Sequence, residues 1–157
     1  RVAAALAQAD PAGEAAYAAN LAHLTEELER LEEEMARGLA FCARDTIVVS
    51  HAAFGYLTAR FGVRQLAVAG LSPEAEPSPA RLQEVVRQVR AVGATHIFFE
   101  TLVSPAVAET IAREVGAQTL VLNPLEGLTV QEVQAGEDYF SVMRRNLAHL
   151  RTALGCP

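Results

Sequence analysis

The sequence predicts an α/β fold in which a four-stranded parallel sheet has helices on both faces and a long helix precedes it. Two observations support this prediction. Short runs of β-branched and aromatic residues alternate with stretches of helical periodicity, and the runs are apolar throughout, as in strands buried on both faces of a parallel sheet. Before them, apolar residues recur at spacings of three and four, which indicates one long amphipathic helix.

The long helix should begin at Asp10-Pro11, with Asp10 as the N-cap and Pro11 at the first helical position. Its apolar stripe predicts a helix from about residue 13 to residue 40. Such a helix spans roughly 40 Å, more than a domain of this size needs. We therefore expect a second lobe to pack against its first half.

Proline, glycine and capping residues indicate where the remaining helices and strands begin and end. A proline-rich loop is expected over residues 70–79, with Ser78 capping the helix that follows. Strands are expected at 46–49, 65–69, 95–99 and 118–122, and helices at 52–61, 79–93, 104–116 and 137–154.

The chain starts at Arg1, without methionine and already within a helical pattern, so we interpret it as a fragment. We expect residues 1–43 to form a linker helix and residues 44–157 to form a C-terminal metal-binding lobe. The N-terminal lobe would then be absent from this chain.

Bulk composition excludes several classes of function. A formal net charge of -6 argues against binding to nucleic acid, which needs basic patches. No apolar run approaches the ~20 residues of a membrane span. The sequence contains no GxSxG elbow, no GxxxxGK[ST] loop and no GxGxxG after the first strand, so it indicates no cofactor enzyme.

Candidate site residues follow from the rule that ligands bind at the carboxyl ends of parallel strands. The first predicted strand ends at His51, the third ends at Glu100, and the fourth runs into Asn123 and Glu126. One imidazole and two carboxylates should therefore lie at the same edge of the sheet. These groups suit a divalent metal.

Each candidate also has a simpler interpretation. His51 could be a histidine at a helix N-terminus bonded to the backbone, and Glu126 an ordinary exposed loop carboxylate. Glu100 could orient a metal ligand or anchor a loop. A zinc site takes more than two protein ligands. Either another lobe supplies the rest, or the chain is a small metal-dependent hydrolase that uses His51, Glu100 and Glu126 together.

The two cysteines, Cys42 and Cys156, are far apart in the sequence and form no CxxC motif. They are either two buried free thiols or one disulfide that ties the start of the lobe to its last residues. A disulfide would require an oxidising compartment.

Several segments resemble the zinc/manganese solute-binding proteins of ABC metal transporters (cluster A-I), specifically their C-terminal lobe. The similarity covers nearly the whole chain, and its most specific parts surround His51 and the Asn-Pro-Leu-Glu loop. The matching segments are residues 48–57, 70–79, 98–100, 122–129, 138–139, Met143 and 146–147.

This resemblance implies a protein of two α/β lobes joined by a long helix, with the metal between them. It implies that His51 and Glu126 are the two ligands from this lobe, with Glu100 and Asn123 behind them. Many members carry a ligand aspartate at the position of Asn123. This chain departs from that pattern, and the resemblance therefore assigns the ligand role to Glu126. Histidine at position 51 favours Zn(II) over Mn(II).

The resemblance further implies an extracytoplasmic protein, periplasmic or lipid-anchored at the cell surface. Its partners would be zinc and the membrane permease of an ABC transporter, and it would catalyse no reaction. An oxidising location favours a disulfide between Cys42 and Cys156.

Overall fold

The computed structural model describes residues 1–69 and 78–157. The chain divides into two compact units, Arg1–Glu34 and Met35–Pro157. The second unit carries all the predicted site residues.

The first unit is helical. Helix α1 (Val2–Ala9) is followed by a 3₁₀ turn η1 (Pro11–Gly13), which leads directly into the long helix α2 (Glu14–Gly38). The predicted cap at Asp10 is wrong in detail, because its side chain bonds no helix N–H group. Its carboxylate instead accepts a hydrogen bond from the Tyr17 hydroxyl at 2.8 Å. Three leucines of the apolar stripe, Leu21, Leu24 and Leu28, are exposed by 41–51%.

The second unit contains the predicted four-stranded parallel sheet. The strands are β1 (Thr46–Val49), β2 (Arg64–Ala67), β3 (His96–Phe99) and β4 (Gln118–Val121), in the order β2-β1-β3-β4. All neighbouring pairs are parallel. The fold class predicted from the sequence is therefore confirmed.

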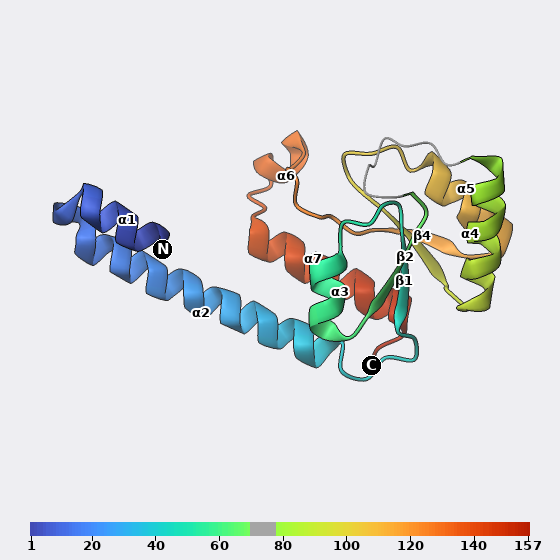
Figure 1. The fold of residues 1–157 in the computed structure, drawn as a ribbon, viewed down its shortest axis with the longest axis horizontal. Coiled ribbons are helices and arrows are strands. Elements are labelled where there is room, and N and C mark those ends of the chain that lie inside the picture. Colours follow the sequence, from blue (N-terminus) through green and yellow to red (C-terminus); the bar gives the residue numbers. More distant parts are fainter. Residues whose placement is uncertain (70–77) are drawn as a thin grey trace. The chain divides into compact units, whose positions relative to one another are not determined.

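Helices cover both faces of this sheet (Figure 1). Helices α4 (Pro79–Ala91) and α5 (Ala106–Val115) pack on one face around a fully buried cluster that includes Val48 and Ile97. Helices α3 (Gly55–Phe61) and α7 (Tyr139–Leu154) lie on the other face. This distribution is the one that right-handed crossovers give for the observed strand order.

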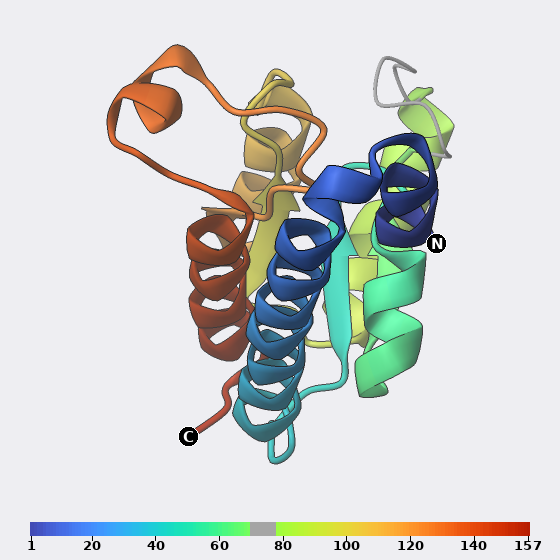
Figure 2. The same cartoon turned by 90° about the vertical axis from the view of Figure 1, so that its left-hand side faces the viewer.

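Two local differences from the sequence prediction lie near the sheet edge. Helix α3 begins three residues later than expected, because the chain after His51 first makes a turn in which Ala53 N–H donates to the His51 carbonyl. The chain between β4 and α7 also contains a short helix, α6 (Val130–Gln134), that the sequence analysis missed (Figure 2). It starts with a capping box made by Thr129 and Glu132.

Most of the predicted proline-rich loop, residues 70–77, lies outside the described residues. Its end is described, and there Ser78 caps α4 as expected by accepting a hydrogen bond from the Arg81 N–H at 3.2 Å. Within the described parts of the chain, no helix is both long and apolar enough to cross a membrane.

The end of the chain is fastened to the segment that enters β1. A disulfide joins Cys42 to Cys156, so the expected pairing is present and the free-thiol alternative is not. Two backbone hydrogen bonds accompany it, from Ala43 N–H to the Gly155 carbonyl at 3.3 Å and from Arg44 N–H to the Leu154 carbonyl at 3.0 Å.

Candidate metal centre

The predicted site residues follow the carboxyl ends of neighbouring strands. Strands β1 and β3 are adjacent and pair Val49 with Phe98, which brings the residues just after each strand to the same edge. The Ser50 hydroxyl donates to the Phe98 carbonyl at 3.0 Å and extends this connection beyond the ladder. His51 and Glu100 are the next polar side chains along the two segments.

His51 and Glu100 form a buried pair. The Nδ1 atom of His51 is in direct hydrogen-bond contact with Oε1 of Glu100. The two residues are only 3% and 4% exposed. The His51 side chain thus bonds a carboxylate rather than the backbone, contrary to the simpler interpretation of this histidine. Since Nδ1 is engaged, Nε2 is the ring nitrogen left to bind a metal.

Burial and two neighbouring charged groups act on the pKa of Glu100. Burial raises the pKa of Glu100 above its ordinary value, while the adjacent His51 opposes the rise through its charge and hydrogen bond. The negative charge of Glu126 raises the pKa further. The charge of Glu126 thus acts in the same direction as burial and against the effect of His51.

Glu126 lies in a loop whose shape is set by Asn123. The Asn123 side chain accepts a hydrogen bond from the Leu125 N–H at 2.8 Å, closing a tight turn. Leu125 then has a φ of 65°, which is costly for a residue with a branched side chain. The next residue, Glu126, is exposed. A carboxylate carried on a turn of this kind can reach an ion outside the lobe's own core.

Asn123 itself is only 3% exposed. Its Oδ1 atom is occupied by Leu125 N–H, so the amide oxygen is not free to bind a metal. Its Nδ2 atom is buried and has no hydrogen-bond partner among the described residues. An N–H donor repels a cation, and this arrangement is consistent with Glu126 as the ligand of the loop.

The structure adds one residue that the sequence analysis did not single out. Asn146 of α7 is 2% exposed and makes two hydrogen bonds to the main chain of Asn123. The sequence indicates that Asn146 is buried through its spacing, four residues after Val142 and four before Leu150 on the apolar stripe. An amide on the apolar stripe of a helix must find buried partners.

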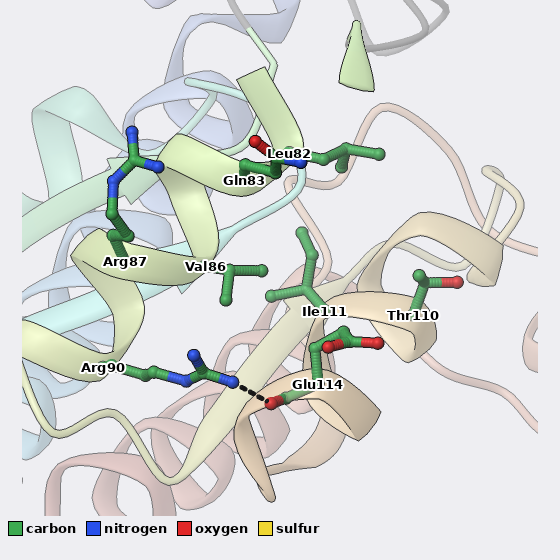
Figure 3. Close-up of a pocket in the computed structure, with 8 residues that line it drawn as sticks. All are labelled: Leu82, Gln83, Val86, Arg87, Arg90, Thr110, Ile111 and Glu114. Atoms are coloured by element: carbon green, nitrogen blue, oxygen red, sulfur yellow. Dashed lines mark hydrogen bonds between the residues drawn. The ribbon is translucent and has the colours of Figure 1, made fainter. Parts of the chain in front are cut away.

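No set of three or more His, Cys, Asp or Glu side chains in residues 1–69 and 78–157 is arranged to hold a metal ion. A groove of about 440 Å³ does lie between α4 and α5 (Figure 3). Arg90 crosses it to donate to the Glu114 carbonyl at 2.6 Å. None of the predicted site residues lines this groove.

Comparison with known proteins now identifies the family. Residues 1–153 match the sequence profile described as ZnuA, zinc-uptake complex component A, periplasmic. The chain belongs to the ZnuA family. Over 132 residues it is 45% identical to the zinc-binding lipoprotein AdcA of Streptococcus pneumoniae serotype 4, and this match covers 84% of the chain. It is 35% identical over 145 residues, 92% of its length, to the high-affinity zinc uptake system protein ZnuA of Bacillus subtilis.

Solved structures of this family share the fold. The Zn(II)-bound ZnuA-like domain of Streptococcus pneumoniae AdcA superposes with a TM-score of 0.83 at 40% identity, covering 98% of this chain and 57% of that one. The ZnuA-family chain described here spans 26% of the pneumococcal AdcA sequence and 46% of the Bacillus subtilis protein.

Proposed function

We propose that this chain is part of an extracytoplasmic zinc-binding component of an ABC-type importer, which captures Zn(II) and delivers it to a membrane permease. The observation that carries the proposal is the buried contact between His51 and Glu100 at the carboxyl edge of the sheet. A carboxylate on one ring nitrogen fixes the tautomer and orientation of a metal-binding histidine and makes it a better ligand.

In this proposal His51 binds zinc through Nε2 and Glu126 binds it through its carboxylate. Glu100 orients His51, and Asn123 shapes the turn that presents Glu126. One imidazole and one carboxylate suit zinc, whereas manganese prefers a site richer in oxygen ligands. Zinc is therefore the favoured ion and manganese the less favoured one.

Two ligands do not complete a zinc site. We infer that the remaining ligands come from an N-terminal lobe of the same protein. Residues 1–43 would then be the connecting helix and residues 44–157 the C-terminal lobe. The greater length of the relatives supports this division, because the chain spans only a fraction of each.

The proposed location is outside the cytoplasm, either in the periplasm or at the cell surface on a lipid anchor. The family description supports a periplasmic protein, and one relative is named a lipoprotein. The disulfide between Cys42 and Cys156 is consistent with an oxidising compartment.

The alternative, a small metal-dependent hydrolase, has less support. It requires a third protein ligand and an open coordination position within this chain. Among the described residues, Glu100 is the one further predicted group at the edge, and it is already bonded to His51. The family to which the chain belongs consists of metal-binding components of transporters rather than enzymes.

Zinc titration of the full-length protein tests the proposal. His51→Ala and Glu126→Gln should each weaken zinc binding strongly, and manganese should not displace zinc from the unsubstituted protein. Glu109→Gln, which changes an exposed carboxylate on α5, should have no effect. Unchanged zinc binding in both site variants would show that the ion binds elsewhere.

A further inference from the structure

The loop that carries Glu126 is held by a side chain from a distant helix. Asn146, in the middle of α7, accepts a hydrogen bond from Asn123 N–H at 3.0 Å through Oδ1. It donates one to the Asn123 carbonyl at 2.8 Å through Nδ2. A single side chain therefore satisfies both main-chain groups of a buried residue.

These two hydrogen bonds satisfy main-chain groups just beyond the end of β4, where, among the described residues, no neighbouring strand does so. Strand β4 stops at Val121, and the last ladder bond beyond it runs from Leu122 N–H to the Phe99 carbonyl at 2.9 Å. At residue 123 the amide of Asn146 takes the place of a neighbouring strand. Without it, a buried N–H and a buried carbonyl would lose their partners, which is costly.

The conformation of Asn123 in turn affects the position of Glu126, three residues later. Because its main chain is fixed by Asn146, Asn123 can direct its own side chain at the Leu125 N–H. That bond closes the turn that holds Leu125 at positive φ, and Glu126 follows at once. Glu126 is exposed, so the turn, which sets the direction of its main chain, is the constraint on where its side chain starts.

A second contact from the same face of α7 supports the same segment. His149, one turn after Asn146, lies with Nδ1 2.7 Å from the Val121 carbonyl and donates a hydrogen bond to it. Helix α7 thus contacts the chain on both sides of Leu122, immediately before the turn.

We propose that Asn146 is a positioning residue for the zinc site, which sets metal affinity by fixing the turn that presents Glu126. This inference depends on the proposed function, in which Glu126 is a ligand. Asn146 does not bind the ion itself. It lowers the cost of ordering the loop at the moment of binding, as side chains behind a metal ligand do.

The test is a zinc titration of the full-length protein carrying Asn146→Leu, which keeps the branching at Cγ, is somewhat larger and loses both hydrogen bonds. The matched control is Leu150→Ala, one turn further along α7, which truncates a fully buried side chain and leaves both hydrogen bonds to the Asn123 main chain in place. Thermal unfolding of the metal-free proteins is measured alongside. We expect Asn146→Leu to lower zinc affinity by about 10–100-fold and Leu150→Ala to lower stability without this loss.

Asn146→Asp provides a second variant of nearly the same shape. It keeps the acceptor for Asn123 N–H and loses the donor, so its zinc affinity should lie between those of the wild type and Asn146→Leu. Two results would overturn the inference: wild-type zinc affinity in folded Asn146→Leu, or an equal loss of affinity in Leu150→Ala. His51→Ala and Glu126→Gln in the same series separate the two proposals, because unchanged affinity in those variants overturns the proposed function as well.

Discussion

Replacing Glu100 by glutamine should separate zinc affinity from fold stability. Glutamine keeps an oxygen that can accept the hydrogen bond from His51 Nδ1, and it has nearly the same volume. It removes the negative charge that, on the proposed function, makes His51 a stronger zinc ligand. The variant therefore changes the electrostatics behind His51 while leaving the packing of the site almost intact.

The two expected effects have different sizes. Loss of a carboxylate partner behind a metal-binding histidine lowers affinity by about 10–100-fold, which corresponds to about 1.4–2.7 kcal/mol. Stability should change little or increase at neutral pH. Burial raises the pKa of Glu100, which means that the folded state disfavours its ionised form, and glutamine carries no charge to bury.

Competition titration with a zinc chelator measures the first quantity, and urea unfolding of the metal-free protein measures the second. Glu109→Gln is the control for a lost carboxylate at an exposed position and should change neither. If Glu100→Gln bound zinc as tightly as the wild type, Glu100 would not act through His51. If it lost stability and affinity together, its role would be that of a structural anchor.

Two further predictions concern stability. Replacing Cys42 and Cys156 by alanine should lower the free energy of unfolding by about 4–5 kcal/mol in the chain-entropy model, because the disulfide closes a loop of 114 residues. Urea unfolding measures this, and a loss no larger than that of a surface substitution would contradict it. The second prediction concerns Glu132, whose pKa is lowered below 4.5, first by the hydrogen bond from Thr129 N–H and also by Arg145. Its contribution to stability is therefore present above about pH 4.5 and is lost as the pH falls through the lowered pKa. Unfolding over a pH series should show a smaller acid loss of stability in Glu132→Gln than in the wild type, and equal pH profiles would refute the assignment.

The sheet and its carboxyl edge could be predicted from the sequence because both depend on patterns along the chain. Apolar runs gave the strands, and the rule for ligand sites in parallel sheets then placed His51 and Glu100 at one edge. Their direct contact could not be predicted, since the residues are 49 positions apart and depend on the register between β1 and β3. Sequence separation carries no information about that register.

Two features near the site were missed for different reasons. Helix α6 has five residues, too few for a helical period to emerge, and only the Thr129–Glu132 spacing indicated its start. Asn146 lies in a segment that resembles the family's C-terminal helix, and that resemblance does not by itself indicate a buried amide. Its position between Val142 and Leu150 on the apolar stripe of α7 was the available signal.

At the carboxyl edge of the sheet, several polar side chains make hydrogen bonds to the main chain. The Ser50 hydroxyl bonds to β3, Arg81 donates to the Ala67 and Val68 carbonyls at the end of β2, and Asn146 and His149 bond to the chain at the end of β4. On the proposed function, the described residues then offer one buried imidazole and one exposed carboxylate to the metal. In that proposal the edge supplies two protein ligands, which is fewer than a zinc site takes. On the same proposal, capture and release of zinc would depend on how the proposed N-terminal lobe approaches, since removal of its ligands would leave the ion with too few partners to stay bound.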